Sequence, residues 1–221
     1  MTTVPTSEEA PEADLPPSPA EQTAAVAPPM WRRAPGWAFT GLTAAGAFLL
    51  VWSASYPTGS APLFLLGFAW LVPCALVWTV RLITYLVGLR NEHRSGPFWP
   101  FLVAPVGAVA TLALCSSTLP LDVRWAVSRS AFDTEADQLQ AESERRGVGE
   151  DHLLIEDEQI GLYAVSSAWV DEHGNAFFVV NGSGFIDGGG FARFPGDVPT
   201  PSGDDDYEHL QGDWYVWFDA F

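Results

Sequence analysis

The stretch that decides the fold runs from Leu63 to Leu86, LFLLGFAWLVPCALVWTVRLITYL, and its only formally charged residue is Arg81. About 20 apolar residues, each adding about 1.5 Å of helix, cross the hydrocarbon core of a bilayer. The part before Arg81 is already close to that length, so the segment from Pro62 to Leu89 predicts a membrane helix. No Asp, Glu or His lies in a predicted span to partner Arg81, and we expect this arginine to set orientation.

Similar apolar runs lie on both sides of this segment. Three spans are predicted at about residues 37–56, 62–86 and 98–119, inside a membrane region of residues 31–119. Pro73 is expected to kink the second span, and Pro120 is expected to end the third. Gly41 and Ala45 form a small-residue pair in the first span that would let another helix approach closely.

Arginines near the spans are unevenly divided, and cytoplasmic loops carry the excess of positive charge. One side has five and the other has two: Arg32, Arg33, Arg81, Arg90 and Arg94 against Arg124 and Arg129. This count predicts a multi-pass protein of the cell membrane with a cytoplasmic N-terminus. Residues 120–221 are then an extracytoplasmic domain.

Residues 1–30 are rich in Pro, Ala and Glu and contain almost nothing to bury. Such a segment cannot offset the entropy lost on ordering, so we expect a disordered, acidic cytoplasmic tail. Its proline-rich stretch from Pro16 to Pro19 could serve as a peptide ligand, although a solvated tail is the simpler expectation. It lacks the apolar region of a secretory signal peptide.

Residues 120–221 carry most of the negative charge, with 21 acids and five arginines in a chain of net charge −17. That charge repels phosphate backbones, so nucleic-acid binding is not expected. All ten basic residues of the chain are Arg, which suggests a GC-rich bacterial genome.

The pattern of residues 120–221 predicts a small α+β domain, in which one helix lies on an antiparallel β-meander of four to six strands. The helix is expected to begin near Ser128 or Ser130 and to end at Arg145-Arg146-Gly147. Strands are predicted at residues 123–127, 159–170, 176–180 and 214–221, with a further hairpin, 184–187 and 190–194, around Gly188-Gly189. Residues 195–206 are predicted to be a loop.

Three segments of this domain carry a family resemblance: Gly161-Leu162-Tyr163, Gly190-Phe191-Ala192-Arg193-Phe194-Pro195 and His209-Leu210-Gln211-Gly212-Asp213-Trp214-Tyr215. Over roughly residues 121–221 the chain resembles the C-terminal, extracytoplasmic domain of uncharacterised actinobacterial multi-pass membrane proteins. The resemblance implies no activity. Relatives often carry cysteines near the glycine segment, and this chain has none there, so a disulfide of that kind is absent.

Sequence motifs of common enzymes are missing, including G-x-S-x-G, H-E-x-x-H, the P-loop and C-x-x-C. Asp204, Asp205 and Asp206 with Glu208 are the best candidates for binding a cation, but a solvated acidic loop is the simpler expectation because the spacing of an EF-hand is absent. Spacing also selects no acid/base pair among Asp157, Glu158, Asp187 and Asp213. No catalytic, cofactor-binding or metal-ligating residue is therefore assigned, and no cofactor is expected.

These features favour an integral membrane protein that displays a binding, sensing or complex-assembly module outside the cell. Its expected partners are the lipid bilayer and a protein of the membrane or envelope. Two alternatives remain: a cell-envelope hydrolase that uses paired carboxylates, and a membrane-embedded accessory subunit of a transporter or secretion complex.

Overall fold

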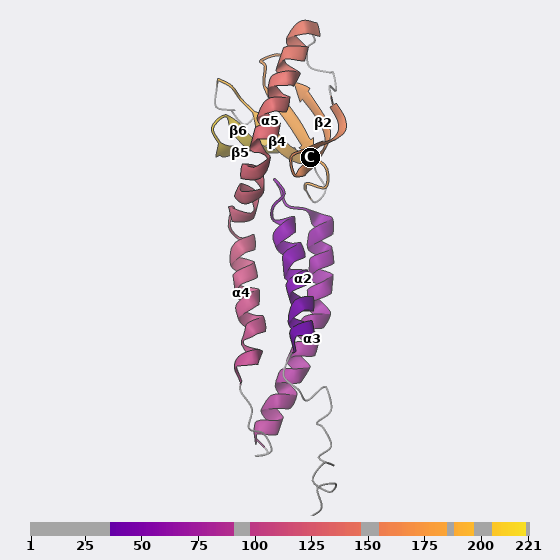
Figure 1. Cartoon of the computed structure of the whole chain (residues 1–221), viewed down its shortest axis with the longest axis vertical. Helices are drawn as coiled ribbons and strands as arrows, with labels where there is room; N and C mark the ends of the chain where they lie inside the picture. Colours follow the sequence, from indigo (N-terminus) through magenta and orange to yellow (C-terminus); the bar gives the residue numbers. More distant parts are fainter. Residues whose placement is uncertain (1–35, 91–97, 147–154, 185–187, 197–204, 220–221) are drawn as a thin grey trace, which may run out of the picture. The chain divides into compact units, whose positions relative to one another are not determined.

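The computed structural model describes residues 36–90, 98–146, 155–184, 188–196 and 205–219. Within them the elements follow the order α2, α3, η2, α4, α5 and then β1 to β6 (Figure 1). The predicted tail at residues 1–30 lies outside the described residues. The combination of helices with an antiparallel sheet confirms the α+β class predicted for the C-terminal part.

The first two helices form a hairpin. α2 covers Trp37–Ser53 and α3 covers Ala61–Arg90, and they lie side by side in Figure 1. α3 runs through Pro73 without a break. Pro62 is in its first turn, where a helix loses no internal hydrogen bond to proline.

The hairpin is tightest at Gly46 and Gly67. A Cβ atom added to Gly46 would lie 2.7 Å from the side chain of Trp70, and one added to Gly67 would lie 3.2 Å from the Gly46 carbonyl oxygen. A Cβ atom added to Gly41 would meet nothing within 4 Å. Gly46 and Gly67, rather than the predicted pair Gly41 and Ala45, are therefore the small residues that let these helices approach.

Prolines divide the third apolar run. Trp99–Phe101 form the 3-10 helix η2, Val103–Cys115 form α4, and Leu119–Arg146 form α5. Pro105 and Pro120 each lie in the first turn of a helix, a place where proline is tolerated. Pro120 therefore begins α5 instead of ending a span, and the prediction of one helix over residues 98–119 is wrong.

Length and composition qualify one described helix, α3, to cross a membrane alone. The segments Trp99–Cys115 and Leu119–Arg145 qualify only as a pair, and they are bent by 56° at the break between them. α2 has 17 residues and falls below the length required. The described part of the chain thus contains one or two candidate spans, where the sequence predicted three.

The sheet has six strands in the order β1-β2-β3-β4-β6-β5, and every neighbouring pair is antiparallel. The strands are β1 (Ile155–Ile160), β2 (Tyr163–Val170), β3 (Ala176–Val180), β4 (Gly189–Arg193), β5 (Asp205–Gln211) and β6 (Trp214–Asp219). The first four strands are a meander, as predicted. The final hairpin is reversed in space, so that β6 pairs with β4 and β5 forms an edge.

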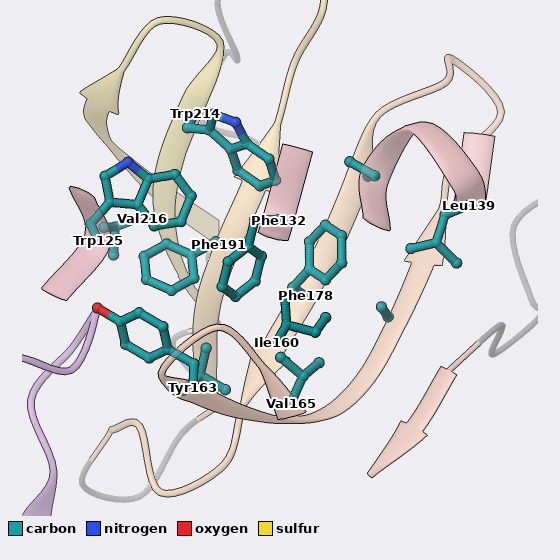
Figure 2. Close-up of a cluster of buried hydrophobic side chains, with 14 of the residues drawn as sticks. Trp125, Phe132, Leu139, Ile160, Tyr163, Val165, Phe178, Phe191, Trp214 and Val216 are labelled. Carbon is teal, nitrogen blue, oxygen red and sulfur yellow. The ribbon is translucent and has the colours of Figure 1, made fainter. Parts of the chain in front are cut away.

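α5 packs on one face of this sheet, and the core lies between them (Figure 2). Phe132 is the centre of the core, with ring centroids of Phe178 and Phe191 each 5.2 Å away. Polar contacts hold the helix in place, because the Trp214 indole N–H donates to Asp133 at 2.8 Å and Arg193 pairs with Asp137 at 2.6 Å.

Four details of the predicted domain are wrong. Residues 123–127 belong to α5, which begins at Leu119 and not near Ser128 or Ser130. Trp125 is 2% exposed while Val123 and Val127 are 59% and 65% exposed, as helical spacing requires. Residues 159–170 are not one strand, since a turn at Gly161 separates β1 from β2. Gly189 is in β4 rather than in a turn, and residues 205–211, not predicted as a strand, form β5. Residues 185–187 of the predicted hairpin lie outside the described residues.

Candidate functional site

The turn between α2 and α3 is bonded into the α+β part of the chain. Ser60 forms a parallel bridge with Gly184, and the Gly184 N–H donates to the Gly59 carbonyl at 2.9 Å. Beside this bridge the hydroxyl oxygens of Thr58 and Ser183 are 2.8 Å apart. The turn thus joins an apolar helical hairpin to the loop that follows β3.

Buried serines close the turn on itself. The Ser53 hydroxyl donates to the Ser60 carbonyl at 2.7 Å and accepts the Ser60 N–H at 3.2 Å. Ser53, Ser55 and Ser60 are each 4% exposed or less. Because buried polar groups are stable only when hydrogen-bonded, this set of bonds holds the turn in one conformation.

The central residue of the junction is Arg124 of α5, which is 6% exposed. Its guanidinium carbon lies 4.8, 4.3 and 4.0 Å from the ring centroids of Trp52, Tyr56 and Tyr163. Trp52 belongs to α2, Tyr56 to the turn and Tyr163 to β2. One cation is therefore surrounded by rings from the helical hairpin and from the sheet, and each ring attracts it through its negative face.

Hydrogen bonds fix the orientation of this guanidinium. One terminal nitrogen donates to the Ser55 hydroxyl at 3.1 Å, and the other donates to the Leu162 carbonyl. The inner Nε atom is buried without a partner, and among the described residues Arg124 forms no ion pair with a carboxylate. A buried cation normally has a counterion, so here the rings and two neutral acceptors replace it.

Tyr163 completes the junction from the sheet side. Its hydroxyl points away from the core towards the α2–α3 turn (Figure 2) and donates to the Ser55 carbonyl at 3.2 Å. Burial raises the pKa of Tyr163 well above its usual value, and this effect outweighs the opposing effect of the Arg124 charge. Tyr163 therefore remains a neutral donor at physiological pH.

A close contact between Ser128 and Gly161 positions the Leu162 carbonyl, which accepts a hydrogen bond from Arg124. Gly161 has φ +58, and a Cβ atom added there would lie 2.6 Å from the Ser128 side chain. The Ser128 hydroxyl accepts the Leu162 N–H at 3.0 Å and donates to the Arg124 carbonyl at 3.0 Å. The β1–β2 turn is thus held against α5 next to the guanidinium.

This junction is suited to mechanical connection rather than to bond chemistry. It joins the α2–α3 hairpin, α5 and two turns of the sheet through buried contacts that need one mutual arrangement. We name it the arginine junction, and it consists of Arg124, Trp52, Ser55, Tyr56 and Tyr163. The sequence counted Arg124 only as a charge near a span. One feature of the sequence could have indicated the junction. Trp52 and Tyr56 lie at the end of the first apolar run, and Arg124 follows the end of the third, so both places are expected on the same side of the membrane.

The structure does not bring the predicted cation ligands together. Asp204 lies outside the described residues, and only the backbone of Asp205 is described. Asp206 is exposed and accepts its neighbour's N–H, from Tyr207, at 3.0 Å, and Glu208 is exposed. The described residues contain no group of three or more His, Cys, Asp or Glu side chains placed to hold a metal.

The strand order separates Asp213 from the other two described acids that were considered for catalysis. Asp157 and Glu158 are in β1, whereas Asp213 lies in the turn between β5 and β6. β1 and β6 are four strand spacings apart in the sheet, which is about 19 Å. Asp213 therefore forms no acid/base pair with either residue, and Asp187 lies outside the described residues.

One electrostatic repulsion between acids was not predicted. The pKa of the Glu135 carboxyl on α5 is raised by partial burial and by the negative charge of Glu158. These residues come from separate elements that pack together, so their spacing in the sequence gave no signal. The negative charge of Glu158 therefore disfavours the ionised form of Glu135.

A second feature is an apolar groove among α2, α3 and α4, with a volume of about 650 Å³. Small side chains line it from two helices, among them Ala44 and Ala47 of α2 and Ala104 and Ala108 of α4. Thr43 and Thr111 are among its few polar residues.

No protein-family model, curated protein or solved structure matches this chain. The resemblance to actinobacterial membrane proteins therefore stays a prediction.

Proposed function

We propose that this chain is a membrane-anchored protein in which a rigidly mounted extracytoplasmic α+β module serves in binding, sensing or complex assembly. The observation that carries this proposal is the arginine junction. It fixes the module on the α2–α3 hairpin instead of leaving it on a flexible tether. A partner bound to the module would therefore be held in a defined orientation relative to the membrane.

The surface of the helices supports membrane anchoring. Among described residues, every large apolar side chain that is strongly exposed lies between Trp37 and Val127, with the exception of Leu162. In the most apolar window of α3 only 6% of the residues are buried, whereas the core helix of a water-soluble protein is mostly buried. An apolar surface this extensive is not stable against water. A bilayer would cover it.

Element lengths fit this proposal unevenly. α3, with 30 residues, is about 45 Å long and exceeds the bilayer core of about 30 Å. α2, with 17 residues, is about 26 Å long, which is near the lower limit for a span. We therefore propose that the hairpin crosses the membrane and that α4 with the start of α5 returns the chain to the outer side.

The positions of the arginines favour an outer location for the module. Arg81 and Arg90 lie in the last third of α3, and the Arg81 guanidinium carbon is 5.6 Å from the Phe39 ring centroid near the start of α2. That end of the hairpin carries exposed positive charge and would be cytoplasmic. At the other end Arg124 is enclosed by aromatic rings.

Topology is tested with reporter fusions to the full chain. A periplasm-type reporter placed after the C-terminus is expected to be active, and one placed in the link between α3 and η2 is expected to be inactive. Extraction with alkaline carbonate is expected to leave the protein in the membrane pellet. The opposite reporter pattern, or release by carbonate, would overturn the proposed anchoring.

Partner binding is tested by crosslinking the full-length protein in its native membrane, followed by co-purification. Wild-type protein and an Arg124→Met variant are compared at equal membrane abundance. A specific partner is expected to crosslink to the wild type and to be lost or mispositioned with the variant. Equal crosslinking of both would show that a fixed mount is not needed for assembly.

The apolar groove favours a second candidate, the membrane-embedded accessory subunit. In that case a partner helix would pack in the groove against its small residues. Filling the groove with Ala47→Leu and Ala108→Leu is expected to abolish partner crosslinking, whereas Val106→Leu on the exposed side of α4 is the matched control. Loss of crosslinking with the groove variants and not with Arg124→Met would favour this candidate over the first.

A further inference from the structure

Leu162 is the one large apolar side chain that is strongly exposed among the described side chains of the sheet and its turns. It is 44% exposed and lies in the turn between β1 and β2. A single exposed leucine is common on protein surfaces. This one has a fixed place beside the arginine junction, because its carbonyl accepts a hydrogen bond from Arg124 and its N–H donates to Ser128.

The β1–β2 turn lies at the end of the sheet that faces the helical hairpin. β2 begins at Tyr163, and its antiparallel neighbour β3 ends at Val180, so the β1–β2 turn and the loop after β3 share one end of the sheet. That loop is joined to the α2–α3 turn by the bridge between Gly184 and Ser60. In the proposed topology Leu162 therefore lies on the membrane side of the module.

The first turns of α5 carry exposed apolar side chains at the same level. Leu119, Val123 and Val127 follow one another at intervals of four residues, which places them on one flank of the helix. Each of them is more than half exposed. Leu162 is bonded to Ser128, the residue after Val127, so it lies at the level of this flank. We name Val123, Val127 and Leu162 the apolar belt.

The neighbouring flank of α5 is charged. Asp122, Arg129 and Asp133 share it, because they are spaced by seven and four residues. Asp122 is exposed and accepts a hydrogen bond from the Thr118 hydroxyl at 2.7 Å, and Arg129 lies 3.6 Å from Asp133. A helix with one apolar and one charged flank is suited to the membrane interface, where its apolar flank meets the acyl chains and its charges meet water.

Helix lengths place the apolar belt at the outer edge of the bilayer core. η2 with 3 residues and α4 with 13 residues extend together about 26 Å, which is less than the core thickness of about 30 Å. The part of α5 from Leu119 to Val127 is about 12 Å long, and α5 is bent by 56° from the segment before it. With α4 along the membrane normal, this part of α5 adds about 7 Å and completes the crossing.

α2 indicates the same level independently. It extends about 26 Å from Trp37 to Ser53, which is close to the thickness of one bilayer core. Trp37 and Trp52 are exposed at its two ends, as expected of tryptophans at the two membrane interfaces. The Arg124 guanidinium carbon is 4.8 Å from the Trp52 ring centroid, so the part of α5 that carries the apolar belt lies at the outer interface.

From these observations we infer that acyl chains of the outer leaflet cover the apolar belt. The module is then seated in the bilayer through Leu162 and one flank of α5, in addition to its bonds to the α2–α3 turn. Arg124 lies at the edge of the hydrocarbon, where water is scarce, and aromatic rings and neutral oxygens solvate its charge instead. This inference rests on the proposed membrane anchoring and names lipid as the partner of the membrane-facing end of the module.

The test measures the depth of single labelled cysteines in the full-length protein, reconstituted in phosphatidylcholine nanodiscs. The chain carries Cys74→Ser and Cys115→Ser, and one new cysteine at a time, Val127→Cys or Leu162→Cys, is labelled with nitrobenzoxadiazole. Lipids with a nitroxide near the carboxyl end of the acyl chain are expected to quench most of the fluorescence at both positions. Aqueous iodide is expected to quench little of it.

Matched controls lie on the same elements, farther from the membrane. Thr134→Cys is about 10 Å further along the exposed side of α5, and Glu172→Cys is in the β2–β3 turn at the opposite end of the sheet. Both labels are expected to be quenched by iodide and not by the lipid nitroxide. Val109→Cys on the exposed side of α4 is the control for the span itself, and a nitroxide near the far end of the acyl chain is expected to quench it most. Near-ultraviolet circular dichroism of each variant verifies that the core is intact.

Iodide quenching at Val127 and Leu162 as strong as at Thr134 and Glu172 would overturn the inference. Protection from iodide without quenching from the lipid would also overturn it, and would assign the apolar belt to contact with a second copy of this chain. If the label at Val109 is quenched from the lipid but the labels at the apolar belt are not, this inference fails and the proposed anchoring stands. If no label is quenched from the lipid, both fail.

Discussion

Replacement of Arg124 by lysine is expected to destabilise the protein at least as much as replacement by methionine. Methionine loses two hydrogen bonds to a charged donor, worth about 1.5–3 kcal/mol each, and three ring contacts, worth about 0.5–2 kcal/mol each. It also removes the desolvation cost of a buried guanidinium, which is several kcal/mol. The net loss expected for Arg124→Met is therefore about 2–4 kcal/mol.

Lysine retains a buried charge that is more strongly hydrated than guanidinium, so the desolvation cost remains. Its single ammonium cannot reproduce the planar contact with three rings while reaching both the Ser55 hydroxyl and the Leu162 carbonyl. We expect Arg124→Lys to lose about 1–2 kcal/mol more than Arg124→Met. Lysine is the chemically conservative replacement. It is expected to be the more damaging one because the cation at position 124 is enclosed without a counterion.

The assay is urea unfolding in detergent micelles, followed by the near-ultraviolet circular dichroism of the buried rings. The control is Arg129→Lys, because Arg129 lies on the same helix with a side chain that is 38% exposed and 3.6 Å from Asp133. Its effect should stay within about 0.5 kcal/mol. A lysine variant as stable as the wild type, or clearly more stable than the methionine variant, would refute the account of the junction.

Three further predictions concern other parts of the chain. Gly161→Ala is expected to lower the free energy of unfolding by about 3 kcal/mol or more, because the residue has φ +58 and the added Cβ would lie 2.6 Å from Ser128. Gly174→Ala is the control for backbone strain alone, since Gly174 has φ +80 but nothing within 4 Å of an added Cβ. Equal urea midpoints of the two variants would contradict the packing argument. Gly46→Leu is expected to separate α2 from α3, since the space is filled by Trp70 and Leu71, and to lower the thermal midpoint in detergent by several degrees. Gly41→Leu is the control and should leave the midpoint unchanged. An unchanged thermal midpoint for Gly46→Leu would argue against the contact between the helices. Glu135→Gln is expected to be more stable than the wild type at neutral pH and to lose this advantage on acidification: a raised pKa means that the folded state holds the Glu135 proton more tightly, so wild-type stability falls as pH rises above the ordinary value of 4.5. A stability difference between Glu135→Gln and the wild type that does not change between pH 4 and pH 7 would contradict the raised pKa of Glu135.

The sequence was sufficient for elements whose pattern is local. The alternation of Ala176 to Val180 predicted β3, and the run from Pro62 to Leu89 lies within α3, which covers Ala61–Arg90. The prediction for Pro120 was wrong because a proline can either end one helix or begin the next. The apolar residues after Pro120 decide between these outcomes through their contact with the sheet, which the local sequence does not reveal. Trp125 alternates with Val123 as a strand residue would, and only its burial against Phe191 and Trp214 identifies it as helical.

The candidate site was beyond the reach of sequence analysis for a different reason. Its members come from three separate stretches of the chain, and Trp52 and Tyr163 are more than 100 positions apart. Each aromatic ring alone has an ordinary explanation as an interfacial or core residue, and Arg124 alone has one as a topogenic charge. β5 was missed because Asp205, Asp206 and Glu208 are unfavourable in strands. Its pairing with β6 compensates for their low propensity.

A disulfide between the α2–α3 turn and the loop after β3 tests whether the module is fixed on the helical hairpin. The hydroxyl oxygens of Thr58 and Ser183 are 2.8 Å apart, so cysteines at both positions have their sulfur atoms within reach of a bond. The measurement is the oxidation of Thr58→Cys with Ser183→Cys in intact membranes, in a chain that also carries Cys74→Ser and Cys115→Ser, followed by non-reducing electrophoresis. A fixed mount predicts rapid and complete formation of the intramolecular disulfide, with none in either single variant. A pair that stays reduced under conditions that oxidise exposed thiols would contradict it.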